Sequence, residues 1–148
     1  MVFTLDASLY AIELRRVEQV VRVVEIRPFP SAPEIVSGVF DLHGELVPVV
    51  NLRRRFRLAE RAPYLSDQLM IARTSRRRLA LLVDRVDGVV SVNLADLTEP
   101  ENVVPGTGYV RGIMRLPAEG MVFIHDLDTF LSLDEETRLG AALERISP

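Results

Sequence analysis

Residues 36–50 read VSGVFDLHGELVPVV, and residues 110–124 read VRGIMRLPAEGMVFI. Both segments start with an aliphatic residue, place a glycine two positions later, and reach a leucine at the seventh position. Each then passes through a turn rich in Gly or Pro into a second apolar run, which is typical of tight hairpins. A strand, a turn and a strand can recur by chance in a β protein, but the matched order of features favours an internal duplication.

The rest of the chain extends this pattern. A short amphipathic piece follows each copy and begins at Asn51 or Asp126, residue types that favour a helix cap. Between the copies, residues 69–72, 79–83 and 89–92 form short apolar runs at the spacing of a meander of strands. The sequence therefore predicts an all-β fold built from two small, pseudo-symmetric barrels that lie side by side.

Two helical segments are also predicted. Apolar residues recur at helical spacing in one stretch near the start, at Val17, Val20, Val21 and Val24, and they predict a short helix there. Residues 134–146 begin with three acidic side chains, which suit the first turn of a helix. They predict a helical tail on the surface at the C-terminal end.

Composition narrows the class of protein. The chain has 148 residues, the length of one ordinary domain, and carries a net charge of −3. It has no cysteine, which excludes disulfides, thiolate metal sites and thiol nucleophiles. Neither a secretory signal nor an apolar run long enough to span a membrane is visible, so we expect a cytoplasmic protein that does not insert into the membrane.

The sequence offers little for catalysis. Its two histidines, His43 and His125, lack the spacing of metal ligands, and no nucleophile motif or phosphate-binding loop is present. Asp84 and Asp87 are interpreted as solvated turn carboxylates. Arginine runs at residues 53–57 and 76–78 could grip phosphates, but few aromatic residues accompany them and the net charge is negative. We therefore expect no enzyme, no cofactor, no metal and no nucleic-acid partner.

Residues 38–56, which read GVFDLHGELVPVVNLRRRF, closely resemble the signature of the CheW family of chemotaxis coupling proteins. Further similar landmarks follow in the family's order at residues 3–5, 10–12, 17–20, 82–86 and 109–112. The resemblance covers about residues 2 to 133.

This resemblance implies a fold of two five-stranded, SH3-like β-barrels within one domain spanning residues 1–148. We expect the first barrel to use strands at about residues 1–5, 8–14 and within 23–60. The second barrel is expected at about residues 64–125, before the helical tail.

The resemblance also implies a non-catalytic adaptor that couples a chemoreceptor to a CheA-type histidine kinase. Its expected partners are the kinase and the cytoplasmic tip of the receptor, in arrays near the membrane. The residues expected to line or support the receptor-binding groove are Val17, Gln19, Gly38, His43 and Leu69. The residues expected near the kinase-binding surface are Leu81, Val83 and Val89.

The sequence departs from the family at this groove. The usual Asn-Leu-Arg-Gly turn reads Asp41-Leu42-His43-Gly44 here, and Gln19 stands where a Glu is common. Losing an arginine removes a permanent charge and a bidentate donor. The alternative hypothesis is therefore a divergent adaptor that binds only the kinase, or one that serves a pathway such as surface motility.

Overall fold

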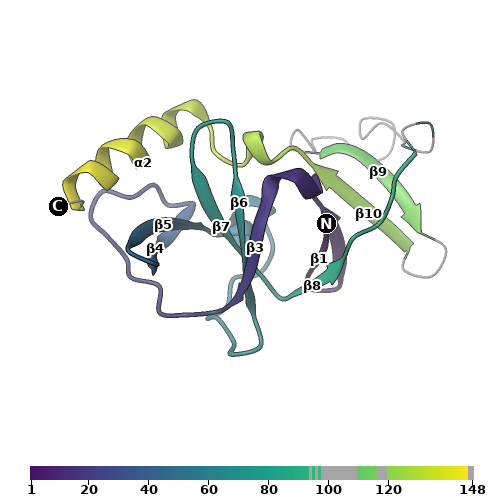
Figure 1. The fold of residues 1–148 in the computed structure, drawn as a ribbon, viewed down its shortest axis with the longest axis horizontal. Helices are drawn as coiled ribbons and strands as arrows, with labels where there is room; N and C mark the ends of the chain where they lie inside the picture. The colour runs from purple at the N-terminus through teal and green to yellow at the C-terminus, as the bar shows by residue number, and fades with distance from the viewer. Residues whose placement is uncertain (94, 96, 98–109, 117–119, 147–148) are drawn as a thin grey trace.

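The computed structural model describes residues 1–93, 95, 97, 110–116 and 120–146. Most of the helices and strands in this part of the chain are short strands, joined by tight turns and 3₁₀ turns (Figure 1). The elements are β1 (Val2–Leu5), β2 (Ser8–Ala11), η1 (Leu14–Arg16), β3 (Val17–Arg22), β4 (Val36–Leu42), β5 (Glu45–Val50), α1 (Leu52–Arg55), β6 (Gln68–Arg73), β7 (Arg78–Val83), β8 (Arg85–Gly88), β9 (Val110–Leu116), β10 (Gly120–His125), η4 (Leu127–Thr129) and α2 (Leu133–Ile146).

The strands form two five-stranded sheets with the same internal order. Sheet A runs β8-β1-β2-β10-β9, and sheet B runs β3-β6-β7-β5-β4. The two repeated segments are the hairpins β9–β10 and β4–β5, and the second strand of each lies parallel to its next neighbour, β2 or β7. A helical turn follows each hairpin, capped by Asn51 or by Asp126. The predicted duplication is thus confirmed at the level of sheet topology.

The division of the strands between the sheets corrects the predicted subdomain boundaries. Strands β1 and β2 belong to sheet A with β10, whereas β3 to β7 form sheet B without them. The chain thus starts in sheet A, builds sheet B, and returns to sheet A after Asp84. The sequence pattern specifies strands but not their partners, because pairing is decided by tertiary contacts.

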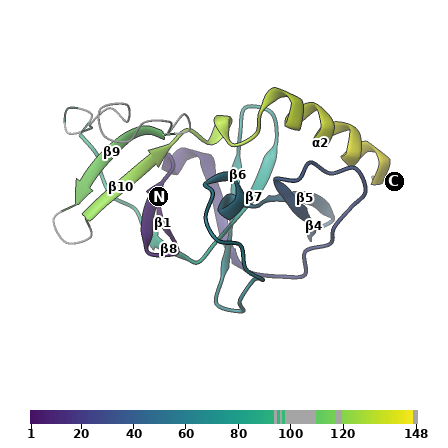
Figure 2. The same ribbon diagram turned by 180° about the vertical axis from the view of Figure 1, so that it is seen from behind.

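The two sheets lie side by side, with α2 running along sheet B (Figures 1 and 2). Backbone hydrogen bonds between Arg27 and Val39 attach the segment that follows β3 to β4, the opposite edge of sheet B. Closure of each sheet into a barrel remains a prediction.

The segment from Val17 is a strand, so the helix predicted there is wrong. Strand β3 pairs antiparallel with β6, and its register shifts between Val17 and Gln19 because Glu18 is an extra residue. A β-bulge of this kind breaks the strict alternation of buried and exposed side chains. The resulting spacing of valines imitates a helical period, although β-branched residues favour strands.

The bounds of one predicted strand and of the predicted C-terminal helix differ from those in the structure. The strand expected at residues 89–92 lies earlier, as β8, and Val89 is 57% exposed. The C-terminal helix forms as α2, one residue earlier than predicted, but it is not merely a surface tail. Leu139 and Ala142 are buried, and Leu139 belongs to the main core.

Among the described residues, buried apolar side chains form three clusters. Alternate residues of β6 and β7 point to opposite faces of sheet B, so that Met70 and Leu81 join one cluster while Leu69 and Ala80 join another. A third cluster lies on one face of sheet A. The largest cluster, which we call the shared core, combines side chains from both sheets, from η4 and from α2, including Phe3, Leu5, Tyr10, Met70, Leu81, Val83, Phe130 and Leu139.

Gly38 shows why the first repeated segment requires a glycine. A Cβ atom at this position would lie 2.4 Å from the carbonyl oxygen of Arg27, which accepts a hydrogen bond from the N–H of Val39. At the equivalent position of the second copy, Gly112, a Cβ atom would meet only the side chain of Leu97, at 3.4 Å. Gly38 therefore allows a close backbone approach inside the fold.

We predict that Gly38→Ala lowers the free energy of unfolding by about 1 to 3 kcal/mol, because the segment at Arg27 must move away from β4. The matched control Gly112→Ala should cost clearly less, since a leucine side chain can shift. Urea denaturation followed by circular dichroism measures both variants. Equal losses would contradict this role for Gly38.

Candidate docking surfaces

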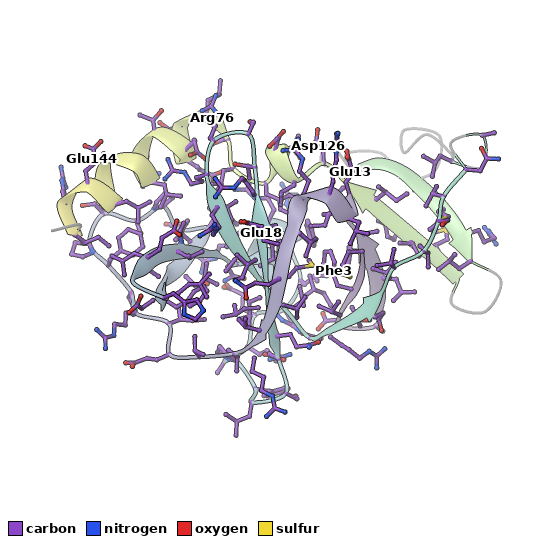
Figure 3. The ribbon with its side chains drawn as sticks, viewed as in Figure 1. Phe3, Glu13, Glu18, Arg76, Asp126 and Glu144 are labelled. Atoms are coloured by element: carbon purple, nitrogen blue, oxygen red, sulfur yellow. The ribbon has the colours of Figure 1, made fainter. Side chains whose placement is uncertain are left out.

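Two of the residues expected at the receptor groove are exposed and come from opposite edges of sheet B. Gln19 on β3 is exposed, and so is His43 in the β4–β5 turn. Arg78 on β7 joins the two elements, because its Nε donates to Glu18 at 2.7 Å and its Nη1 donates to Glu45. We call the set Val17, Glu18, Gln19, His43, Glu45 and Arg78 the Arg78 surface. Figure 3 shows Glu18 on β3, and Phe3 on β1 of the other sheet.

The shape of the β4–β5 turn explains part of the DLHG sequence. His43 and Gly44 both adopt positive φ, 51° and 88°, as a two-residue hairpin turn that matches the twist of the strands requires. Asp41 Oδ1 accepts a hydrogen bond from the Gly44 N–H at 2.7 Å. The turn is thus fixed by Asp41 and Gly44, which leaves the exposed His43 side chain available to a partner.

The other residues expected at the groove are internal. Leu69 is fully buried in the cluster on the face of sheet B that points away from the shared core. Gly38 packs against Arg27, and Val17 is half-buried against the shared core. Leu69 and Gly38 are therefore buried in this structure, where they can only support a surface from inside. Their apolar or glycine character reflects packing, which a sequence pattern cannot distinguish from an apolar docking face.

The residues expected at the kinase surface also divide into buried and exposed residues. Leu81 and Val83 are buried in the shared core, so they support the fold from inside. Val89 lines an open groove of about 560 Å³ on sheet A, together with other apolar side chains and a charged rim. We call it the Val89 groove; its apolar residues include Val2, Leu9, Val89, Val90 and Leu116, and its charged residues are Asp6, Arg85 and Asp87.

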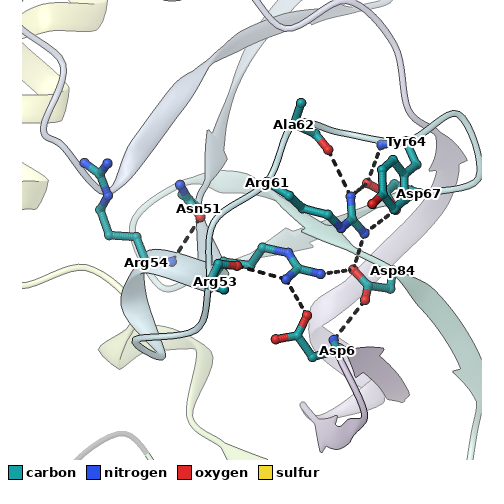
Figure 4. Close-up of polar contacts among 10 residues, drawn as sticks. Asp6, Asn51, Arg53, Arg54, Arg61, Ala62, Tyr64, Asp67 and Asp84 are labelled. Carbon is teal, nitrogen blue, oxygen red and sulfur yellow. Dashed lines mark hydrogen bonds and ion pairs between the residues drawn. The ribbon is translucent and has the colours of Figure 1, made fainter.

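Sequence reasoning missed an ionic network, the Asp84 network, which consists of Asp6, Arg53, Arg61, Asp67 and Asp84 (Figure 4). Asp84 Oδ1 accepts from Arg53 and from Arg61, each at 2.7 Å, and Asp84 Oδ2 accepts from the N–H of Asp6 at 2.9 Å. Arg53 also donates to Asp6 Oδ1 at 2.5 Å. Asp84 is therefore not a merely solvated turn carboxylate but the centre of this network.

Other arginines of the two runs also bind carboxylates of the chain. Arg54 contacts Glu60 at 3.2 Å, Arg55 contacts Glu135 at 2.5 Å, and Arg77 donates to Glu136 on α2. These contacts support the protein-facing interpretation of the arginine runs. The sequence gives no signal for the pairs of Arg55 and Arg77, because their partners on α2 lie far away in the chain.

Asp67 is the most deeply buried carboxylate of the Asp84 network. Burial alone would raise the pKa of its side chain, but two hydrogen bonds from Arg61, at 2.8 and 2.9 Å, and one from the Tyr64 N–H outweigh that effect. The pKa of Asp67 therefore lies below its ordinary value. The Arg61 guanidinium also lies 3.8 Å from the centre of the Tyr64 ring, which holds the loop before β6 in one conformation.

His125, the second histidine, lies inside the molecule. Its ring stacks on Phe56 with 4.5 Å between ring centroids, and it also packs against Tyr10 and Phe130. Among the described residues, no cluster of three or more His, Asp or Glu side chains is arranged to hold a metal ion. None of the helices in that part of the chain is both long enough and apolar enough to span a bilayer.

Comparison with known proteins defines the class to which this fold belongs. The family model of the CheW-like domain matches residues 1–135. The chemotaxis protein CheW of Treponema pallidum is 31% identical over 93% of this chain and 84% of its own length. The CheW of Klebsiella aerogenes is 26% identical over 91% of this chain and 82% of its own length.

A solved structure supports the same class. The scaffolding protein TtCheW from Thermoanaerobacter tengcongensis superposes with a TM-score of 0.80 and 27% identity, over 90% of this chain and 92% of that one. The fold is thus that of a scaffolding domain of bacterial chemotaxis. The chain belongs to the CheW family.

We predict that Asp67→Asn lowers the free energy of unfolding at neutral pH by about 3 kcal/mol, since it replaces the buried carboxylate that binds the Arg61 guanidinium with a neutral group. The folded-state pKa of Asp67 is depressed, so its contribution is present above the ordinary carboxyl pKa of 3.8 and is lost as the pH falls through the folded value. Urea denaturation at pH 7 and pH 3 measures the effect.

The difference between wild type and Asp67→Asn should shrink at pH 3. Glu60→Gln, which breaks a fully exposed pair with Arg54, is the control and should change little. A difference that stays constant between the two pH values would contradict the assignment of this stability to the Asp67 carboxylate.

Proposed function

We propose that this protein is a non-catalytic adaptor that couples a chemoreceptor to a CheA-type histidine kinase in the cytoplasm, within receptor arrays at the membrane. The observation that carries the proposal is the presence of two different accessible surfaces, the Arg78 surface on sheet B and the Val89 groove on sheet A. The shared core joins the two sheets into one body. An adaptor needs this arrangement, because each partner must be held without displacing the other.

The Arg78 surface is assigned to the receptor tip. Gln19 and His43 provide exposed polar groups, while Arg78 pairs with Glu18 and with Glu45. Hydrogen bonds from Arg78 also keep the pKa of Glu18 below its ordinary value. The receptor contact is therefore expected to depend on polar hydrogen bonding and on the half-buried Val17, with Gly38 and Leu69 supporting it from inside.

The Val89 groove is assigned to the kinase. Val89 and Val90 are both exposed, and the apolar floor continues to Val2 and Leu9 inside sheet A. Interfaces commonly combine an apolar centre with a polar rim, and Asp87 and Arg85 supply such a rim here. Leu81 and Val83 support the groove only indirectly, through the shared core.

The alternative of a kinase-only or surface-motility adaptor has less support. The CheW relatives compared above carry chemotaxis in their names. Replacement of the family arginine by His43 removes a charge from the Arg78 surface, but the turn that presents the residue is intact. We therefore interpret His43 as a change in the receptor contact and not as its loss.

We predict that the double variant Gln19→Ala, His43→Ala binds a chemoreceptor cytoplasmic fragment from the same genome about tenfold more weakly, a loss of about 1.4 kcal/mol. Both side chains are exposed, so the free energy of unfolding and the affinity for the kinase regulatory domain should be unchanged. Glu144→Ala, on the exposed side of α2, is the control. Unaltered receptor affinity would remove the Arg78 surface from the proposal.

We predict the converse for Val89→Asp. A carboxylate at this position of the groove lining should abolish binding to the regulatory domain of the CheA-type kinase, because burying an unpaired carboxylate in the interface is costly. Receptor affinity should remain that of the wild type. Isothermal titration calorimetry with each partner measures both constants, and a Val89→Asp protein that binds the kinase normally would place the kinase elsewhere.

A further inference from the structure

The Asp84 network lies where the chain passes from one sheet to the other. Asp84 is the single residue between the end of β7 in sheet B and the start of β8 in sheet A. Its N–H donates to the carbonyl oxygen of Thr4 on β1, at 3.0 Å, and its carboxylate binds two arginines of the sheet B half. The network therefore acts at the junction of the two halves.

Arg53 makes one of the side-chain contacts that cross this junction; Gln68 of β6 also accepts a hydrogen bond from the Val86 N–H of β8, at 2.8 Å. Arg53 belongs to α1, which follows β5 of sheet B, and its guanidinium binds both Asp84 and Asp6 of the β1–β2 turn in sheet A. The Arg53 side chain is 11% exposed, and it also donates to the Ala59 carbonyl at 3.1 Å. A buried guanidinium with three partners has a fixed position, because each of its hydrogen bonds is directional.

The remaining members keep the sheet B end of the network rigid. Arg61 binds the same Asp84 oxygen as Arg53 and holds buried Asp67 with two further hydrogen bonds. Asp67 in turn accepts from the Tyr64 N–H, and its own carbonyl accepts from the Val23 N–H at the end of β3. The network thus reaches from the edge strand of sheet B to a turn of sheet A.

The interdigitated apolar side chains of the shared core hold the two sheets together and resist their displacement. The polar contacts of the network add a directional constraint at one point of the junction. Charge-assisted hydrogen bonds have narrow distance and angle requirements. Asp6 is also part of the rim of the Val89 groove, which places one end of the network directly beside that surface.

We infer that Arg53 and Asp84 are positioning residues that fix the orientation of sheet A relative to sheet B, and hence of the kinase surface relative to the receptor surface. The inference rests on the proposed function for its biological meaning. Neither residue needs to touch a partner. Loss of the cross-sheet contact should leave each pairwise affinity intact and reduce the control of kinase activity in the complete assembly.

The test compares Arg53→Gln with Arg54→Gln, its neighbour in α1. Both changes remove one positive charge, but Arg54 pairs with Glu34 and Glu60 inside the sheet B half. The chain has no cysteine, so spin labels on Met121→Cys of β10 and Arg22→Cys of β3 report the distance between the sheets without background. Electron paramagnetic resonance measures that distance in the isolated full chain.

The distance distribution should be narrow in the wild type and in Arg54→Gln, and broader or shifted in Arg53→Gln. Arg53→Lys, which keeps the charge but cannot bind two carboxylates as a fork, should fall between them. In parallel, receptor and kinase affinities should stay near wild type for Arg53→Gln, while receptor-dependent kinase activation falls several-fold.

An unchanged distance distribution in Arg53→Gln would overturn the inference, whatever the partners do. A loss of receptor or kinase affinity in Arg53→Gln would also overturn it, because Arg53 would then belong to a docking surface. Failure of the wild-type chain to bind either partner would instead refute the proposed function, and the distance measurement would still decide the role of Arg53 in the fold. Circular dichroism melting confirms that each variant is folded.

Discussion

The shared core between the two sheets is the constraint on which the rest of this structure depends. Each sheet is small, and alternate side chains of its central strands point toward the other sheet, where Phe3 and Leu5 meet Met70 and Leu81. Helix α2 closes the same core with Leu139. Because small sheets bury too little area alone, the two halves stabilise each other and cannot be treated as separate domains.

Charged residues perform a second task at the edges of this core. The arginines that looked like a phosphate-binding run are directed to carboxylates on other elements: Arg53 to Asp6, Arg55 to Glu135 and Arg77 to Glu136. Each of these pairs joins segments distant in the sequence. Arginine suits this use because its guanidinium binds a carboxylate in a fixed geometry and stays charged.

Sequence patterns were sufficient for the repeated hairpins, their turns, the caps at Asn51 and Asp126, and the C-terminal helix. These features are local, so the residues that determine them are neighbours in the chain. The extra residue Glu18 in β3 made the helix prediction from periodicity wrong, because a bulge depends on pairing with the partner strand. The assignment of β1 and β2 to sheet A likewise depends on pairing with β10, more than one hundred residues away in the chain.

Only some of the predicted site residues are accessible, because exposure, like strand pairing, depends on tertiary contacts. Gln19, His43 and Val89 are exposed, whereas Leu69, Leu81 and Val83 are buried, and all six were inferred from similar apolar or family patterns. A strand with both faces buried presents no polar residues that would reveal which face is inside. The Asp84 network joins residues from four separate segments, which only the folded chain brings together.

The central claim is that one rigid body carries two separate docking surfaces. The most direct measurement is sequential binding by surface plasmon resonance, with this protein held on the receptor fragment and the kinase regulatory domain then passed over it. The account predicts that the kinase domain binds the preformed complex with the affinity it shows for the free protein. Displacement of the protein from the receptor, or competition between the two partners, would contradict it.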